Sequence, residues 1–267
     1  MAASSNTLFE QCLAPIFSRL IDGDALLEFR NSIDWPSATA AFTDPDLTYP
    51  AYYRDHNFHG VQGGYLSIDA AVTYDPITRY VLPPNETWIR ESLVRAIRGT
   101  PQRILDLACG TGTTTLMLKQ RFPNAAVVGL DLSPQMLVVC DGKAQDQKLD
   151  VTFCQGNAMD TGLDAESFDV VCTTLLLHET PISVAKTILQ ESLRLLRPGG
   201  QVLILDGNQK TLRAIDWLSN IFEEPFIREY AQGSVDAWLG AAGFESVRTE
   251  DVFWLNQLSY GRKPATA

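Results

Sequence analysis

Basic side chains are scarce in this sequence. Its 267 residues include 21 Lys and Arg against 32 Asp and Glu, which gives a formal net charge of −11 at pH 7. Binding to nucleic acid or to an anionic membrane depends on clustered Lys and Arg that meet negative phosphates. The charge balance therefore argues against both as partners.

Paired cysteines are missing too. Five cysteines are scattered along the chain, and none is spaced as a C-x-x-C pair or with histidine in the order of a zinc site: Cys12, Cys109, Cys140, Cys154 and Cys172. Scattered cysteines in odd number are typical of free thiols in a reducing compartment. We expect neither a disulfide framework nor a zinc site.

Long apolar runs are absent as well. No stretch of about 18 apolar residues, the length that suggests a membrane-spanning helix, is uninterrupted. The first residues also lack the charged start and apolar run of a signal peptide. With 45% apolar and 20% charged residues the chain can nevertheless bury a core. These features predict a soluble, globular, cytoplasmic protein without an integral membrane segment.

The chain changes in texture at about residue 85. Residues 1–85 are rich in aromatic residues, Pro and Gly, and show one clear amphipathic helical stretch at 8–30. We expect them to form an N-terminal helical cap and substrate lid on a core made of residues 86–267. Asn85 is expected to cap the first helix of that core.

The core alternates short β-branched runs with amphipathic helices. Strands are expected at 103–108, 126–130, 151–154, 168–174 and 201–205. Ser133 and Thr180, each followed by Pro, are expected to cap two of the helices between them. Because apolar residues follow one another within each strand, both faces of the sheet should be covered, as in a parallel sheet. The pattern predicts an α/β fold.

An aromatic and apolar helical pattern interrupts this alternation after the fifth strand. It covers about residues 207–233, and we expect it to form a lid over the carboxyl edge of the sheet. Ser234 and Gly243 then bracket a short helix. Residues 246–253 and 255–261 predict two closing strands in a hairpin.

A glycine turn joins the first expected strand to its helix in the sequence ILDLACGTG, residues 104–112. Gly110 and Gly112 lack a Cβ, which would let the backbone approach a ligand. Asp131 follows Gly112 after 18 residues and ends the second strand, where a carboxylate can accept both hydroxyls of a ribose. A nucleoside-bearing cofactor is therefore expected.

Two features favour a sulfonium cofactor over a nicotinamide dinucleotide. Thr115 stands where the dinucleotide fingerprint G-x-G-x-x-G has its third glycine. Asp106 precedes the glycines, where a carboxylate would fit poorly beside a pyrophosphate but could hold the amino group of a cationic amino acid. A nicotinamide-binding Rossmann enzyme is the alternative.

Further motifs follow in a fixed order: GLDLSPQM at 129–136, QGNAM at 155–159, FDVV at 168–171 and LRPGG at 196–200. Together with DLACGTG at 106–112 they resemble the class I S-adenosylmethionine-dependent methyltransferases, specifically the small-molecule group that includes quinone and sterol methyltransferases. The resemblance covers residues 86–206. It implies a Rossmann-like, doubly wound sheet of seven strands that is mostly parallel, with the last strand antiparallel.

The resemblance also implies roles for single residues. Asp106, with the backbone at Ala108 and Gly110, would hold the methionine part of S-adenosylmethionine, and Asp131 would hold the ribose. The other implied cofactor contacts, several of them around the adenine, are Gly112, Leu132, Met136, Asn157, Ala158, Met159 and Thr174. Two positions depart from the family pattern. Ala108 replaces a common glycine, and Asn157 replaces a common Asp, although its carbonyl oxygen can still accept a hydrogen bond.

Candidates for the acceptor side lie in three segments. His178, followed by Glu179, comes directly after the fourth strand and could remove a substrate proton, unless it only bonds the backbone at a helix start. Residues 51–67 carry five rings with polar tips, which either touch a ligand or pack the cap on the core: Tyr52, Tyr53, His56, His59 and Tyr65. Residues 223–230 either line the acceptor pocket or form a solvated charged helix.

No metal is expected, because Thr-Thr-Leu follows the fourth strand where catechol-type methyltransferases have carboxylate ligands. The sequence as a whole predicts methyl transfer from S-adenosylmethionine to an oxygen or carbon of a small, largely apolar metabolite, with His178 as the candidate base. A methyltransferase-fold scaffold without turnover is the alternative. O-, C- and N-methylation and the oligomeric state are left open.

Overall fold

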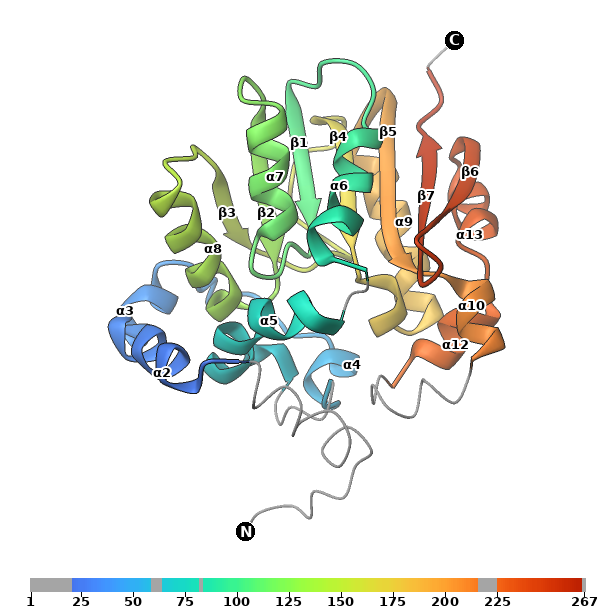
Figure 1. Ribbon diagram of the computed structural model, residues 1–267. Helices are drawn as coiled ribbons and strands as arrows, with labels where there is room; N and C mark the ends of the chain where they lie inside the picture. The colour runs from blue at the N-terminus through green and yellow to red at the C-terminus, as the bar shows by residue number, and fades with distance from the viewer. Residues whose placement is uncertain (1–20, 59–63, 82–83, 216–224, 266–267) are drawn as a thin grey trace.

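A computed structural model describes residues 21–58, 64–81, 84–215 and 225–265, and its centre is a seven-stranded sheet (Figure 1). The strand order is β3-β2-β1-β4-β5-β7-β6, with bounds β1 (Arg103–Leu107), β2 (Ala126–Asp131), β3 (Thr152–Gln155), β4 (Phe168–Thr174), β5 (Leu196–Gly207), β6 (Glu245–Val252) and β7 (Asn256–Arg262). Pairs from β3 to β5 are parallel, and β7 runs antiparallel to both β5 and β6. The predicted mostly parallel sheet with an antiparallel last strand is confirmed.

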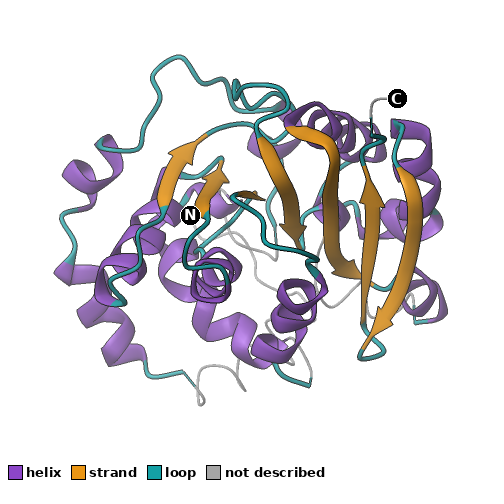
Figure 2. Ribbon diagram, turned by 90° about the horizontal axis from the view of Figure 1, so that it is seen from above, coloured by secondary structure: helices purple, strands orange, loops and turns teal. Residues whose placement is uncertain are grey.

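Helices cover both faces of the sheet (Figure 2). Successive strand residues point to opposite faces, and Ile104 and Leu105 accordingly lie in two different core clusters. One cluster includes side chains of α9 (Ile182–Leu195) and α13 (Val235–Ala242), and the other those of α6 (Glu86–Ala96) and α7 (Thr113–Arg121). Consecutive apolar residues in the strands are thus explained by burial on both sides.

Side-chain caps mark the start of several helices. Asn85 Oδ1 accepts the backbone N–H of Thr87 at 2.9 Å, and Ser133 Oγ accepts that of Met136 at 3.3 Å at the start of α8 (Pro134–Asp146). These two predicted caps are confirmed. The predicted cap at Thr180 is wrong, because Pro181 takes the N-cap position of α9, and Thr180 Oγ1 instead donates to the carbonyl of Leu177 at 3.0 Å.

The N-terminal segment lies at the carboxyl edge of the sheet (Figure 1). Its elements are α2 (Gly23–Ser32), α3 (Trp35–Ala40), α4 (Ala51–Arg54), η2 (Gly64–Leu66) and α5 (Ile68–Val81). Of the amphipathic helical stretch predicted at 8–30, residues 8–20 lie outside the described residues and residues 23–30 are helical. There α2 begins only at Gly23, because Asp22 is extended and its side chain accepts the backbone N–H groups of Asp24 and Ala25.

The segment after β5 also lies at this edge, with α10 (Gln209–Ala214) and α12 (Ile227–Gln232). Strand β5 is longer than expected, since it begins at Leu196 and its register against β4 shifts beside Phe168. Ser234 and Gly243 bracket α13 as predicted, with Gly243 at a φ of 104°. The pocket described next lies between the strand ends and the N-terminal segment.

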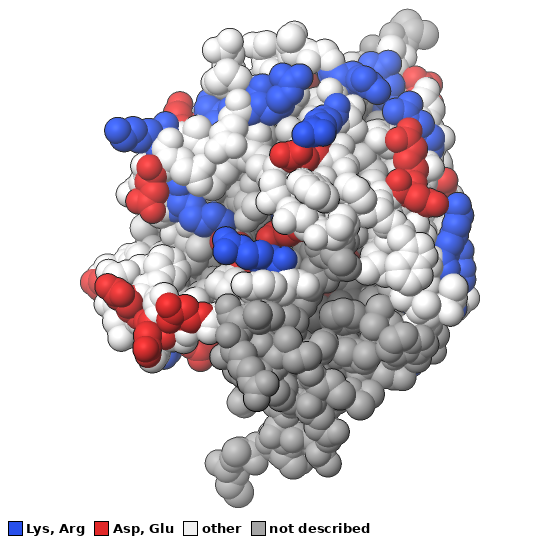
Figure 3. All heavy atoms as spheres, in the orientation of Figure 1, with Lys and Arg blue, Asp and Glu red and all other residues white. Residues whose placement is uncertain are grey.

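On the face shown in Figure 3, Lys and Arg alternate with Asp and Glu across the described residues. No helix within the described ranges is long and apolar enough to cross a membrane. The four cysteines of the described residues are free thiols, and Cys12 lies outside them.

Candidate active site

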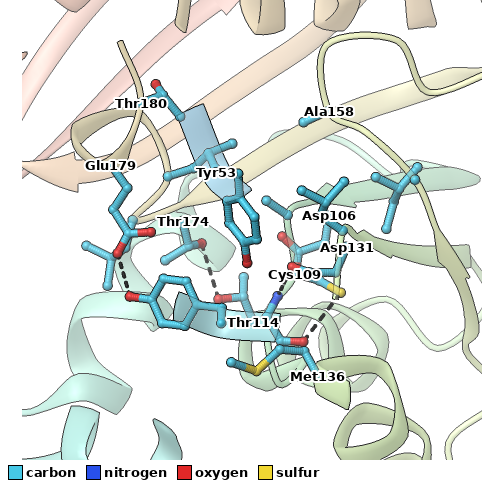
Figure 4. Close-up of a pocket in the computed structure, with 18 of the residues that line it drawn as sticks. Tyr53, Asp106, Cys109, Thr114, Asp131, Met136, Ala158, Thr174, Glu179 and Thr180 are labelled. Carbon is cyan, nitrogen blue, oxygen red and sulfur yellow. Dashed lines mark hydrogen bonds between the residues drawn. The ribbon is translucent and has the colours of Figure 1, made fainter. Parts of the chain in front are cut away.

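A pocket opens at the carboxyl ends of β1, β2 and β4, and tyrosines of the N-terminal segment also line it. It encloses about 840 Å³ of space between atoms, counting the part open to solvent. Most of the predicted site residues line it (Figure 4), namely Tyr52, Tyr53, Tyr65, Asp106, Ala108, Gly110, Asp131, Leu132, Met136, Asn157, Ala158, Thr174 and Glu179.

Three predicted residues are not among those that line the pocket: Gly112, Met159 and His178. Gly112 begins α7, and a Cβ there would lie 2.9 Å from Cys140 Sγ, so this glycine serves the packing of α7 on α8. Met159 packs against the hydrophobic core. His59 lies outside the described residues.

Asp131 ends β2 with its carboxylate held by two backbone N–H groups. Oδ2 accepts from Gly110 at 2.8 Å and Oδ1 accepts from Ser133 at 2.9 Å. Each carboxylate oxygen can accept a further hydrogen bond. Burial raises the pKa of this carboxyl to about 6, against the effect of the backbone hydrogen bonds. The backbone N–H groups of the glycine turn and of the segment after β2 thus orient this carboxylate, and Asp131 lines the pocket. A carboxylate that binds a ribose needs both properties.

The glycine turn has left-handed backbone at three alternate positions, 108, 110 and 112. Gly110 has a φ of 55°, and a Cβ there would meet only Tyr74, at 4.0 Å, so its open side faces the pocket. Ala108 has a φ of 59°. Left-handed backbone favours glycine, which is the physical reason why glycine would suit position 108 and why alanine there is strained.

Asp106, at the end of β1, is 1% exposed. Its Oδ2 accepts the hydroxyl of Thr115 at 2.5 Å, so the residue that replaces the third glycine of the dinucleotide fingerprint binds this carboxylate. Burial raises the pKa of Asp106 to about 6. The pocket therefore holds a second buried carboxylate beside the glycine turn, which suits a cationic group on the ligand.

Sequence reasoning missed a buried cation in the same pocket. Arg90 of α6 is 4% exposed; its Nε donates to Glu86 at 2.8 Å and its Nη1 donates to Thr114 at 2.9 Å. Tyr74 of α5 lies beside it, and burial raises the pKa of that phenol. Glu86 and Arg90 are four residues apart, a spacing that is typical of an exposed ion pair on a helix. The apolar face of the same helix is the only sequence signal that indicates a buried arginine.

The turn after β3 forms the far end of the pocket. Asn157 Oδ1 accepts the backbone N–H of Met159 at 3.0 Å, and the carbonyl of Asn157 accepts that of Asp160 at 3.0 Å. One acceptor site of the amide oxygen is therefore used within the turn, and one remains. Gly156 packs against Leu130, which a Cβ would approach to 2.7 Å.

Aromatic rings form the opposite wall. The hydroxyl of Tyr65 donates to Glu179 Oε1 at 2.6 Å. Tyr52 makes edge-to-face contact with Phe226 at 6.2 Å between ring centroids, so the N-terminal segment touches the segment after β5. Burial raises the pKa of the Tyr53 phenol. In Figure 4 Glu179 lies on the side of the pocket away from Asp131, and Tyr53 stands between them.

His178 lies behind this wall, 7% exposed. Its Nδ1 is 2.5 Å from Asp206 Oδ1, and its ring makes edge-to-face contact with Tyr230 at 6.2 Å between centroids. Its Nε2 is 3.9 Å from Glu179 Oε1. None of the described residues of 223–230 lines the pocket: Arg228 and Glu229 are exposed, whereas Ile227 and Tyr230 are buried in the core.

Within the described residues, no group of three or more His, Cys, Asp or Glu side chains could hold a metal ion.

Known proteins match the core of the chain. A methyltransferase domain model matches residues 104–200. The demethylmenaquinone methyltransferase of Thermus thermophilus is 35% identical over 139 residues, 52% of this chain and 62% of that protein. An uncharacterized methyltransferase of Synechocystis is 33% identical, over 55% of this chain and 68% of its own length. The chain spans about three fifths of the demethylmenaquinone methyltransferases it matches.

Two solved structures share the fold. The phosphoethanolamine N-methyltransferase 2 of Haemonchus contortus, in complex with S-adenosyl-L-methionine, has a TM-score of 0.61 and 17% identity, and the match covers 83% of this chain and 61% of that chain. Human N-acetylserotonin methyltransferase, also in complex with S-adenosylmethionine, has a TM-score of 0.60 and 14% identity over 81% and 61% of the two chains. With these matches, the strand order and the two motif carboxylates in one pocket, the chain belongs to the class I S-adenosylmethionine-dependent methyltransferases, a family of enzymes.

Proposed function

We propose that this protein transfers the methyl group of S-adenosylmethionine to an oxygen or carbon of a small, largely apolar acceptor. The observation that carries the proposal is the Asp131 carboxylate, which is held by Gly110 and Ser133 inside the pocket and keeps acceptor capacity for the two hydroxyls of a ribose.

The pocket residues fit the rest of the cofactor. Leu132, Asn157 and Ala158 form the end where the adenine would lie. Asp106 and Arg90 offer opposite charges for the amino and carboxylate groups of the methionine part. When bound, the cofactor supplies a methyl group already activated by its sulfonium. The protein is then left to position the acceptor and exclude water.

Leucine and tyrosine side chains suit an apolar ring as acceptor. Leu175, Leu176, Tyr52 and Tyr53 line the side of the pocket beyond the strand ends of β1 and β4. Several relatives are named demethylmenaquinone methyltransferases, which supports a quinone-like ring. We include in the proposal that residues 1–85 form a cap and residues 207–233 a lid, a division supported by the contact between Tyr52 and Phe226.

A nicotinamide cofactor is not favoured. Dinucleotide-binding sheets follow the order 3-2-1-4-5-6, whereas this sheet inserts β7 antiparallel between β5 and β6. The third glycine of the dinucleotide fingerprint is also replaced here by Thr115, which donates a hydrogen bond to Asp106.

Two measurements test the proposal. S-adenosylhomocysteine should raise the midpoint temperature of thermal unfolding, and NAD should leave it unchanged. Transfer of a labelled methyl group from S-adenosylmethionine to naphthohydroquinone should then be detectable. A shift with NAD alone would refute the cofactor assignment, whereas a shift with S-adenosylhomocysteine and no transfer into any metabolite of a cell extract would favour a scaffold.

A further inference from the structure

A buried polar chain runs from the end of β5 to the pocket wall. Asp206 ends β5, and His178 and Glu179 lie in the turn η3 (Leu177–Glu179) that follows β4. Asp206 Oδ1 is 2.5 Å from His178 Nδ1, His178 Nε2 is 3.9 Å from Glu179 Oε1, and this oxygen accepts the hydroxyl of Tyr65 at 2.6 Å. Three ionisable groups are thus aligned from the core toward the pocket.

Asp206 holds the turn and selects the histidine tautomer. Its Oδ2 accepts the backbone N–H of Leu177 at 2.8 Å, and its Oδ1 accepts that of Gly207 at 2.7 Å as well as His178 Nδ1. A carboxylate only accepts hydrogen bonds, so Nδ1 carries the proton in this contact. Nε2 is then the ring nitrogen left toward Glu179.

Only one of the three groups reaches the pocket. Glu179 lines it, whereas Asp206 and His178 are 1% and 7% exposed and are absent from its wall. Figure 4 shows Glu179 across the pocket from Asp106 and Asp131, which are proposed to hold the cofactor. Its carboxylate therefore lies on the side left for the acceptor, and the histidine that the sequence suggested as base stands behind it.

We infer that Glu179 takes the proton of the methyl acceptor, and that His178 and Asp206 are positioning residues for Glu179. This inference rests on the proposed function. The acceptor class is a ring compound with an acidic hydroxyl, such as a phenol or hydroquinone. Removal of that proton leaves an electron pair shared between oxygen and ring carbon, so the same base serves O- and C-methylation.

The step balances without another reactant. The hydroxyl proton passes to the Glu179 carboxylate as the electron pair of the acceptor forms a bond to the methyl carbon. The bond from this carbon to sulfur breaks and its electron pair stays on sulfur. In C-methylation the protonated Glu179 then returns its proton to the ring oxygen, and the proton on the methylated ring carbon passes to water, which restores the aromatic hydroxyl. Asp206 positions Glu179 through the turn, because its Oδ2 accepts the backbone N–H of Leu177 and its Oδ1 binds His178, the residue directly before Glu179.

Glu179→Gln keeps the size of the side chain and an oxygen that can accept the Tyr65 hydroxyl. With naphthohydroquinone as acceptor, we expect its kcat to fall about 100-fold or more, the usual contribution of a general base. Its dissociation constant for S-adenosylhomocysteine, measured by calorimetry, should be unchanged. Glu229→Gln makes the same chemical change at an exposed site on α12 and should retain wild-type values.

The positioning role has its own readout. Nitrogen NMR of the His178 ring should show a proton on Nδ1 in the wild-type protein and a changed tautomer in Asp206→Asn, with a smaller loss of kcat than in Glu179→Gln. Wild-type kcat in Glu179→Gln would overturn the inference and leave the proposed function intact. No transfer to naphthohydroquinone by the wild-type enzyme would overturn the acceptor class, and the S-adenosylhomocysteine titration would show whether the cofactor assignment survives.

Discussion

Asp75 of α5 accepts a hydrogen bond from Thr111 in the glycine turn, with 2.5 Å between Oδ1 and the threonine hydroxyl. Its other carboxylate oxygen accepts from Lys143 Nζ of α8 at 2.7 Å. One carboxylate thus joins the N-terminal segment to the glycine turn and to α8. Because the N-terminal segment and the glycine turn both line the pocket, its shape depends on this junction.

Asp75→Ala should loosen that junction. We expect the free energy of unfolding, measured in urea, to fall by about 1 kcal/mol, because hydrogen bonds to charged groups contribute up to about 3 kcal/mol but the side chains of Lys143 and Asp75 are 26% and 33% exposed. The dissociation constant for S-adenosylhomocysteine should rise as well. Asp69→Ala, an exposed carboxylate on the same helix, is the control. Equal behaviour of the two variants would contradict the prediction.

Asp131→Ala should weaken cofactor binding. Loss of a charge-assisted contact costs about 1.5–3 kcal/mol, which is about tenfold or more in the dissociation constant for S-adenosylhomocysteine. Isothermal titration calorimetry measures it. Asp150→Ala removes an exposed carboxylate just before β3 and should bind as the wild type does. Identical titration curves for Asp131→Ala and wild type would refute the ribose role.

Asp106 should make stability depend on pH. Burial raises its pKa from 3.8 to about 6, so the folded state holds this proton more tightly than the unfolded state. The contribution is complete below pH 3.8 and is lost as the pH rises through about 6. Asparagine does not titrate, so Asp106→Asn keeps its stability as the pH rises. From pH 5 to pH 7 the free energy of unfolding of Asp106→Asn, relative to that of wild type, should therefore rise by about 1 kcal/mol.

Urea denaturation at several pH values checks this sign. Asp169 supplies the opposite case: burial is outweighed by backbone hydrogen bonds from Arg103 and Gln102 and by Arg197, and its pKa is lowered. Asp169→Asn should therefore have a lower free energy of unfolding than wild type at neutral pH, and this difference should shrink as the pH falls. A constant difference between Asp106→Asn and wild type across this range would exclude a raised pKa at Asp106.

The sequence was informative where function and fold depend on neighbours along the chain. Consecutive apolar residues marked β1, the glycine turn marked the helix start after it, and spacing alone brought Asp131 to the right strand end. Arg90 and Tyr74 were missed because they come from α6 and α5 and meet the pocket only through tertiary packing. His178 was expected at the pocket, yet Asp206, 28 residues further along on β5, binds its ring behind the wall.

Gly110 and Gly112 looked equivalent in the motif but differ in what surrounds them. Both have positive φ, 55° and 78°. A Cβ on Gly112 would lie 2.9 Å from Cys140 Sγ, whereas a Cβ on Gly110 would meet only Tyr74, at 4.0 Å. Steric overlap in a packed interior adds to backbone strain. The two substitutions by alanine should therefore separate stability from binding.

Gly112→Ala should lower the free energy of unfolding by about 2–4 kcal/mol, the sum of about 1–2 kcal/mol of backbone strain and an overpacking cost of similar size. In Gly110→Ala only the backbone strain should lower the free energy of unfolding. This variant should bind S-adenosylhomocysteine far more weakly, since its Cβ would occupy the ligand side of the turn. Adding Cys140→Ala to Gly112→Ala removes the clashing sulfur and should restore part of the lost stability. Equal stability losses in the two single variants, with no recovery in the double variant, would contradict this division of roles.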